Sequence, residues 1–287
     1  MSPSPSPVVA NWELVRRIQE RRQQRGISVN DITRRLGFTR NYWSAIENEH
    51  KILPENTLRN LFDILEFGDT DRRQLLALRE EAKENGWWSN YSALFDANIQ
   101  RLFGLEHGAH QMRGYDTLLI PGLLQTADYA RAIMSSDATI RPVEIEQRVN
   151  ARLRRQERLR DDAPLHLTVI ISEAALRQQV GGIAVLSGQL DHLLTTIEQH
   201  ENNVEIRVIP FTATACNLFG AGTLSLLDFQ SPRLPRVAWH ETVSTWGVIT
   251  DANKVRDITM AFNEALTRTL GRQETKDLIL THRKDIR

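Results

Sequence analysis

NDITRRLGFTRNYWSAIEN, residues 30–48, is the stretch that decides the fold of the amino-terminal part of the chain. Ile32 and Leu36 lie four positions apart, which places them on one face of a helix. Trp43 and Ile46 lie three positions apart and share one face of a second helix. The glycine between the two pairs is typical of a helix end. The stretch therefore predicts two short helices joined by a tight turn.

Two further helices flank this pair. Residues 12–25 carry apolar side chains at near-helical spacing among arginines, and Pro54 opens a helix with an apolar stripe that reaches Leu65. Short helices with short turns predict a compact all-α domain over residues 11–67. Residues 1–10 are rich in Pro and Ser, and we expect them to be disordered.

Positive charge is concentrated in this first domain. Lys and Arg together number 36 in the chain, as do Asp and Glu, so the formal net charge is zero. From residue 16 to residue 40, however, eight arginines face only Glu20 and Asp31. A helix with polar exposed side chains that follows a Gly turn is the arrangement by which a helix-turn-helix enters the major groove of DNA.

The residue types on this second helix suit base recognition, since Arg pairs with guanine and Asn with adenine. The remaining polar and basic residues suit phosphate contacts, whose contribution falls with salt. We predict base-edge contacts from Arg40, Asn41, Tyr42 and Asn48, phosphate contacts from Thr39, Ser44 and Ser28, and salt-dependent affinity from Arg16, Arg17, Arg34 and Arg35.

Residues 12–66 resemble the XRE, or lambda-repressor-like, family of helix-turn-helix domains, on the stretch quoted above. The resemblance implies that Leu36 and Ile46 are packing residues and that Glu47 has a structural role, pairing or capping inside the domain. Two positions depart from the family pattern. Glu49 stands where the family commonly has Gly after the recognition helix, and Val29 stands where many members carry a DNA-contacting Gln.

A linker helix and a larger second domain follow. Residues 68–88 predict a charged helix that ends at Gly86, and after Pro164 short β-branched runs alternate with helical stretches. The second domain, residues 89–287, is therefore predicted to be α+β with a mostly antiparallel or mixed sheet. The predicted strands cover residues 165–171, 204–211, 222–229, 236–242 and 245–250, with helices over 173–179 and 183–200 and after Asp251.

Residues 70–280 resemble an uncharacterised C-terminal domain that is fused to XRE modules in many actinobacterial regulators. The resemblance rests on the order of NGWW, LLIPGLLQTADYARA, VEIRVIPF and a late VAWHET. It implies a regulatory domain that binds a small-molecule effector or a small protein encoded next to the regulator, in an antitoxin-like pairing. Whether Trp87, Trp88, Tyr115 and Trp239 line a pocket or fill a core stays open.

The chain offers no convergent catalytic or metal-binding set. His240 and Glu241 are predicted to lie on a strand and so to face opposite sides of the sheet. His192 and His200 are eight positions apart, which is not the spacing of a helical zinc pair. Cys216 is the single cysteine, and we expect a small buried thiol. We therefore expect no enzyme, no cofactor and no metal.

No run of about 20 apolar residues and no signal peptide is evident, so we expect a cytoplasmic protein that does not cross the membrane. The function that these patterns favour is sequence-specific transcriptional regulation by a homodimer on double-stranded operator DNA, with an effector or partner bound by the second domain. Two alternatives stay open: a small-molecule sensor with secondary DNA binding, and an enzyme hidden in residues 90–280.

Overall fold

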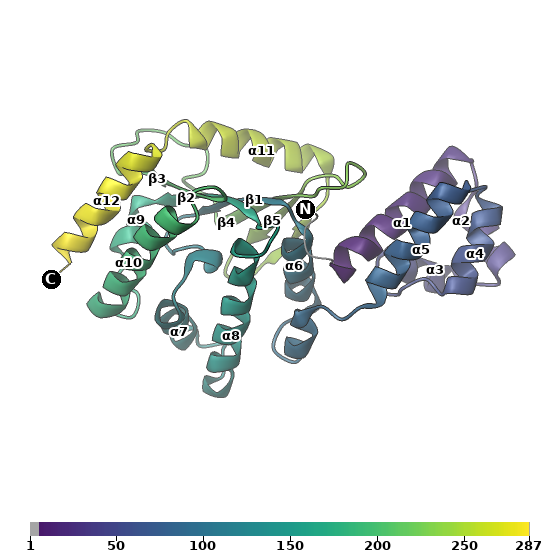
Figure 1. The fold of residues 1–287 in the computed structure, drawn as a ribbon, viewed down its shortest axis with the longest axis horizontal. Coiled ribbons are helices and arrows are strands. Elements are labelled where there is room, and N and C mark those ends of the chain that lie inside the picture. The colour runs from purple at the N-terminus through teal and green to yellow at the C-terminus, as the bar shows by residue number, and fades with distance from the viewer. Residues whose placement is uncertain (1–5, 287) are drawn as a thin grey trace. The chain divides into compact units, whose positions relative to one another are not determined.

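The computed structural model describes residues 6–286 of the chain and divides it into two compact units (Figure 1). The N-terminal unit comprises residues 6–89 with 231–234, and the C-terminal unit comprises residues 90–230 with the rest of the chain from 235 onward. The first is helical and the second combines helices with a six-stranded sheet. The predicted fold class, all-α followed by α+β, is confirmed.

Five helices build one core in the N-terminal unit. Leu14, Ile32, Trp43, Leu58 and Leu75, one from each helix, are all at most 1% exposed and belong to a single hydrophobic cluster. Burial of such a cluster is the main force that holds short helices together, since isolated helices of this length are marginal in water. The helices are α1 (Pro7–Gln24), α2 (Val29–Leu36), α3 (Arg40–Glu47), α4 (Glu55–Ile64) and α5 (Asp69–Lys83).

The four helices α1 to α4 end in the same way. A residue with a left-handed backbone follows or closes each helix, and the next N–H bonds back to a carbonyl five residues earlier, which is the Schellman arrangement. Two of these residues are glycines, for which a positive φ has no steric cost, and two are glutamates. The residues and φ angles are Gly26 (64°), Gly37 (68°), Glu49 (64°) and Glu66 (53°).

Two domain boundaries predicted from the sequence are wrong. Residues 7–10 are helical rather than disordered, because Pro7 occupies the first turn of α1 and the Ser6 hydroxyl accepts a hydrogen bond from Val9 N–H. The remaining residues of that predicted disordered segment, 1–5, lie outside the described residues. The helix predicted as a linker, α5, packs along α1 and contributes Leu75 to the core, so it belongs to the N-terminal unit.

The C-terminal unit is a mixed sheet in the order β3-β2-β1-β4-β5-β6. The first three strands in that order are parallel, joined by helical crossovers, and the others pair antiparallel. The strands are β1 (Gln111–Asp116), β2 (His166–Ser172), β3 (Val204–Ile209), β4 (Thr223–Asp228), β5 (Val237–Glu241) and β6 (Trp246–Ile249).

Helices lie on both faces of this sheet (Figure 1). In that view α11 lies on one side of the strands, and α6, α7, α8 and α10 lie on the other. Tyr115 and Trp239 are at most 2% exposed and fill the core. The helices are α6 (Ala97–Gly108), α7 (Ala127–Ser136), α8 (Ile145–Gln156), α9 (Glu173–Arg177), α10 (Ile183–Gln199), α11 (Ala252–Leu266) and α12 (Arg272–Asp285), with short 3-10 turns η1 (Trp87–Tyr91), η2 (Gly122–Leu124), η3 (Pro142–Glu144) and η4 (Glu157–Leu159).

The five predicted strands are confirmed to within two residues at each end. Helix α6 was not predicted from the sequence, and half-buried Cys216 is less buried than predicted. No helix among the described residues 6–286 is long and apolar enough to cross a membrane.

Candidate nucleic-acid interface

The two central helices of the N-terminal unit have helix-turn-helix geometry. α2 ends at Leu36, and α3 begins at Arg40 after three connecting residues, the first of which is the left-handed Gly37. The hydroxyl of Thr39 accepts a hydrogen bond from Tyr42 N–H at 3.2 Å and so caps α3. Burial of Trp43 on the inner face of α3 leaves the opposite face of this helix exposed to solvent.

The first turn of α3 carries the predicted base-contacting residues. Arg40 and Asn41 are exposed, and neither makes an ion pair or side-chain hydrogen bond among residues 6–286. Tyr42 is half-buried, with its ring 4.6 Å from the Phe38 ring and the Lys51 ammonium 4.6 Å from its centroid. Arg40 and Asn41 are therefore free to meet a ligand, whereas the Tyr42 ring is already packed.

The predicted serine and asparagine contacts are partly engaged within the unit. Asn48 donates a side-chain hydrogen bond to Ser44 Oγ at 3.1 Å, and both residues are exposed. Ser28 caps α2, and its hydroxyl donates to an Asp31 carboxylate oxygen at 2.6 Å. That hydrogen bond, with the nearby Arg34 and Arg35, lowers the pKa of Asp31. The Ser28 hydroxyl must leave this partner before it can meet a phosphate.

Several arginines of the predicted basic cluster are engaged in the fold. Arg17 is 5% exposed and donates to Asp71 and to Gln74 at 3.0 Å, so the prediction that it contacts DNA is wrong. Its charge is used to join α1 to α5. Arg22 pairs with Glu47 at 3.5 Å, as the structural role predicted for Glu47 requires.

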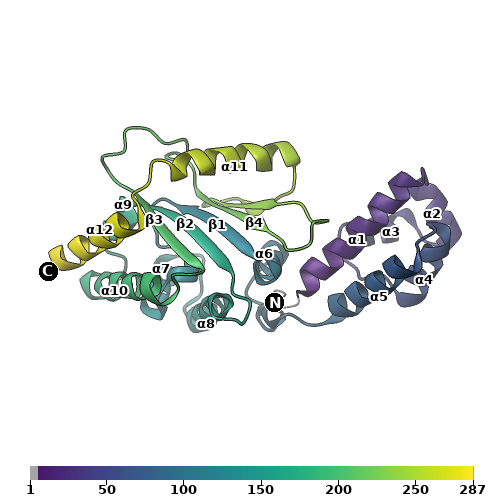
Figure 2. The same ribbon diagram turned by 45° about the horizontal axis from the view of Figure 1, so that its top comes forward.

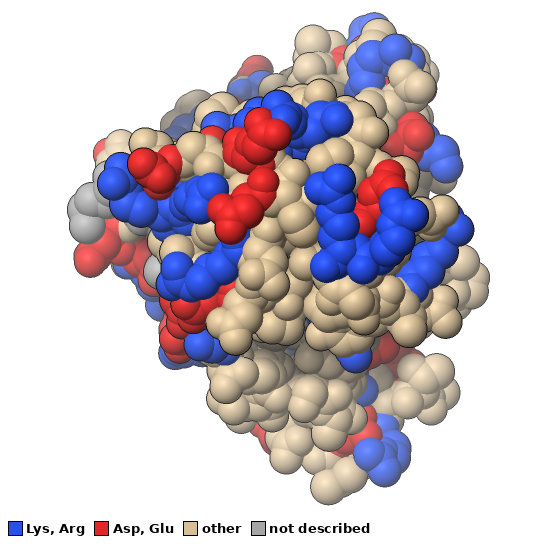
Figure 3. Space-filling model, turned by 90° about the vertical axis from the view of Figure 1, so that its right-hand side faces the viewer, with Lys and Arg blue, Asp and Glu red and all other residues tan. Residues whose placement is uncertain are grey.

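The other predicted arginines differ in how free they are. Arg16 pairs with Glu20 at 2.9 Å, and Arg34 pairs with Asp31. Arg35 is exposed and makes no ion pair within the described part of the chain. Figure 3 accordingly shows Lys and Arg interspersed with Asp and Glu rather than a continuous basic surface.

Sequence reasoning missed Lys51, which lies four positions after the end of α3 and over the Tyr42 ring. Its position just after the recognition helix was the available signal. Val29, at the position where a Gln was expected, is half-buried against the core, so no amide is present there. Glu49 takes the left-handed conformation that Gly usually supplies, and its carbonyl accepts a hydrogen bond from Asn11 at 3.3 Å.

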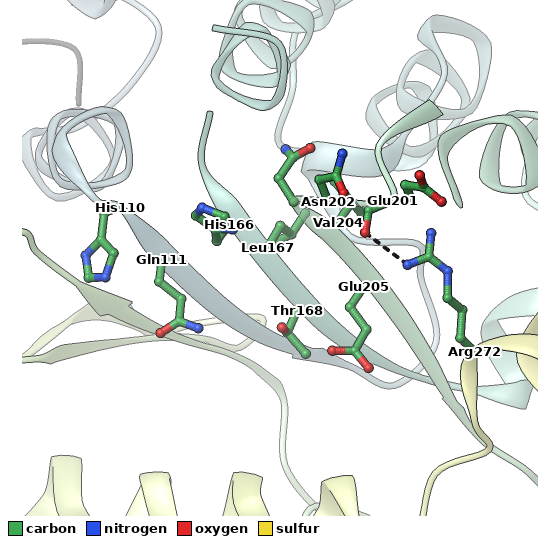
Figure 4. A pocket seen from close by; sticks show the side chains of 11 residues that line it. His110, Gln111, His166, Leu167, Thr168, Glu201, Asn202, Val204, Glu205 and Arg272 are labelled. Atoms are coloured by element: carbon green, nitrogen blue, oxygen red, sulfur yellow. Dashed lines mark hydrogen bonds between the residues drawn. The ribbon is translucent and has the colours of Figure 1, made fainter. Parts of the chain in front are cut away.

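The C-terminal unit has a polar pocket of about 440 Å³ at the amino ends of its three parallel strands (Figure 4). Figure 2 shows the three parallel strands side by side, with α11 above them in that view. The Arg272 guanidinium is held by two carbonyl oxygens, those of Ile197 at 2.6 Å and Glu201 at 3.1 Å. His110, His166 and Glu205 also line the pocket. Within residues 6–286 no group of three metal-binding side chains comes together.

Comparison with known protein families divides the chain in the same way. A family model described as a helix-turn-helix domain matches residues 13–75, and a model described as a domain of unknown function (DUF5753) matches residues 99–281. No curated protein and no solved structure matches the chain. The first domain is of the kind that DNA-binding regulators carry. The second match, over residues 99–281, covers more than half of the chain, so the chain belongs to the family defined by the domain of unknown function DUF5753.

Proposed function

We propose that this protein is a transcriptional regulator that reads a specific operator sequence through α3. The observation that carries the proposal is the first turn of α3, where Arg40 and Asn41 are exposed and unpaired on a helix fixed from behind by Trp43. A recognition helix needs both properties, because its base-reading side chains must be free while its backbone stays in register with the groove.

Arg40 and Asn41 have the donors and acceptors for bidentate contacts to guanine and adenine. Arg35 and Lys51 supply exposed cations on either side of this turn, and they would act on phosphates. A single unit of this size gains affinity and specificity when two copies bind a two-fold operator, so we propose a homodimer. The unit is proposed as an XRE-type domain on the resemblance of residues 12–66.

We further propose that the C-terminal unit controls DNA occupancy by binding an effector or a small partner protein, in the antitoxin-like manner that the sequence resemblance suggests. Support comes from its polar pocket and from half-buried charges at the far end of the same sheet, treated below. We propose binding rather than catalysis, since His240 and Glu241 are adjacent on β5 and face opposite sides of the sheet. Turnover by the full chain on a broad substrate panel would contradict this.

The test is capture of genomic DNA with the purified protein, followed by salt titration on the best site. Asn41→Ala should cost about 1–3 kcal/mol at one or two base positions, as for a lost bidentate contact. Arg35→Ala should weaken binding to all sequences and reduce the salt slope by about 1. Arg73→Ala, an exposed arginine on α5, is the matched control and should bind as wild type.

Absence of any enriched site would contradict the proposal. Equal loss on every sequence in Asn41→Ala would reassign Asn41 to the phosphate backbone.

A further inference from the structure

Charged side chains gather where β1 ends, on the face of the sheet that α8 covers. Asp116 is the last residue of β1, and its carboxylate accepts a hydrogen bond from the Thr223 hydroxyl at 2.7 Å. Thr223 pairs with Glu241 of β5, and Glu241 pairs with Trp246 of β6. Directly paired residues share a face, so these four side chains form one row across four strands.

Arg152 and Arg155 of α8 are close enough to Asp116 and Glu241 of this row to act on them electrostatically. The loop that leaves β1 brings Gly122 against them, so that a β-carbon at Gly122 would lie 3.4 Å from Arg155 Nη1 and 3.7 Å from Arg152 Nε. The loop therefore lies within van der Waals reach of both guanidinium groups. We call Asp116, Arg152, Arg155 and Glu241 the β1-end cluster.

The two arginines of the cluster differ in their partners. Arg155 makes two hydrogen bonds to the carboxylate of Glu106, at 2.8 and 2.9 Å, and Glu106 is 1% exposed. Arg152 donates to the neutral amide of Gln125 at 2.7 Å, and no carboxylate within the described residues pairs with it. Gln125 is itself fixed by a 2.6 Å bond to the Ile120 carbonyl. Arg152 is thus a positioned cation whose charge has no direct counterion.

Asp116 and Arg152 are half-buried and poorly hydrated, whereas Glu241 is exposed. Burial and the nearby Arg155 lower the pKa of Arg152 to about 10. Burial also raises the pKa of Asp116 to about 7, against the opposing hydrogen bond from Thr223. A desolvated cation that still has exposed surface gains more from a bound anion than a hydrated one does.

Apolar side chains border the same place. Leu118 and Leu119, in the loop from β1 to Gly122, are 59% and 37% exposed, and Trp246 at the end of the row is 39% exposed. The Trp246 indole is held by a 2.8 Å hydrogen bond to Asp96 at the start of α6. Large apolar groups are exposed here for a soluble ligand to cover.

We propose that the β1-end cluster binds a small zwitterion, with its carboxylate on Arg152 and its ammonium group on Asp116 and Glu241. A free amino acid with an apolar side chain combines these features, since the side chain would lie against Leu118 and Leu119. Arginine forms bidentate contacts with carboxylates, which matches the unpaired guanidinium of Arg152. The assignment deepens the effector role proposed above and rests on it for its regulatory meaning.

The experiment is a thermal-shift and calorimetric screen of the full chain, without DNA, against the twenty free amino acids. At least one apolar amino acid should raise the unfolding temperature, and its N-acetyl derivative and methyl ester should not, because each removes one of the two charges. Arg152→Gln should weaken binding roughly 10- to 100-fold, as for a lost charge-assisted hydrogen bond. Arg154→Gln, on the exposed side of α8, should bind as wild type.

Asp116→Asn is a second variant that tests the site if Arg152→Gln does not fold. It keeps the acceptor for Thr223 and removes only the charge. Compared with wild type, Asp116→Asn should bind the free amino acid more weakly, and it should bind the N-acetyl derivative no better. No stabilisation by any amino acid, or full binding by Arg152→Gln, would overturn the site. An amino acid that binds at this site without changing operator affinity would keep the assignment and contradict effector control.

Discussion

The two units place their unpaired arginines in opposite surroundings. Arg40 lies on the open surface of α3, where water solvates its charge, whereas Arg152 is half-buried beneath the sheet with a neutral amide as its partner. An exposed cation suits a polyanion and is screened by salt, while a desolvated one favours a single well-placed counterion. We therefore expect salt-dependent attraction of a polyanion by the exposed arginines of the first unit. In the second unit we expect Arg152 to favour a single counterion at a fixed position.

The unfavourable features of the units also differ in kind. In the N-terminal unit the cost lies in the backbone, because Glu49 and Glu66 occupy left-handed positions that favour glycine. In the C-terminal unit it lies in the desolvated charges of Asp116 and Arg152 in the β1-end cluster. The three predictions below break or relieve these features, from the largest expected effect to the smallest.

Glu106→Ala would remove the counterion of Arg155. Arg155 would then be a second arginine, beside Arg152, without a carboxylate partner. Breaking a buried pair in this way costs about 3–5 kcal/mol in the free energy of unfolding. Urea unfolding of the full chain measures the loss. Glu157→Ala, which removes the exposed partner of Arg154 on the same stretch, should cost less than about 1 kcal/mol. Equal losses in the two variants would contradict the difference between buried and exposed pairs.

Asp116→Asn should stabilise the folded chain by an amount that depends on pH, because it removes an unfavourable charge from the same cluster. Burial raises the pKa of Asp116 to about 7 in the folded chain, so the folded state holds a proton that the unfolded state releases near its ordinary pKa of 3.8. Stability therefore falls as pH rises from about 4 to 7, and it levels off above that. Glu241 adds to the raised pKa, while Arg152 and Arg155 oppose it.

The variant should remove this dependence and gain on the order of 2–4 kcal/mol relative to wild type above pH 7, since a tenfold change in proton affinity is about 1.4 kcal/mol. Urea unfolding of both proteins at pH 5 and pH 8 measures the difference. A constant difference between them at the two pH values would show that Asp116 does not titrate in this range.

Glu49→Gly should stabilise the N-terminal unit by up to about 1 kcal/mol, because glycine adopts the left-handed conformation without the steric cost that a side chain has. The reverse change at the equivalent turn, Gly37→Ala, should destabilise it by a similar amount. Thermal unfolding compares the two. A loss of stability in Glu49→Gly would mean that its side chain contributes more than its backbone conformation costs.

Local chemistry explains why the helix-turn-helix could be predicted. The caps at Ser28 and Thr39 and the turn at Gly37 act within a few residues, and all three are visible in the sequence. The burial of Arg17 could not be predicted in the same way, since its partners Asp71 and Gln74 reach it only through the packing of α5 on α1.

The same reasoning accounts for what was missed in the C-terminal unit. In α6 the five consecutive residues 102–106 are all buried, so the helix lacks the one-sided periodicity that marks an amphipathic helix. The β1-end cluster joins residues more than a hundred positions apart, and the basic run of α8 resembles a solvated surface helix until its environment is known. The pattern of residues carries no information on which of its arginines lacks a partner.

The place of α5 in the first core determines where the DNA-reading part of the chain can be separated from the rest. Leu75 is fully buried among residues of α1 to α4, and Arg17 donates hydrogen bonds to Asp71 and Gln74 of α5. A fragment cut at residue 67 would expose an apolar strip along α1 and deprive Arg17 of its hydrogen bonds to Asp71 and Gln74. We therefore expect that the smallest piece able to fold autonomously extends at least through Lys83.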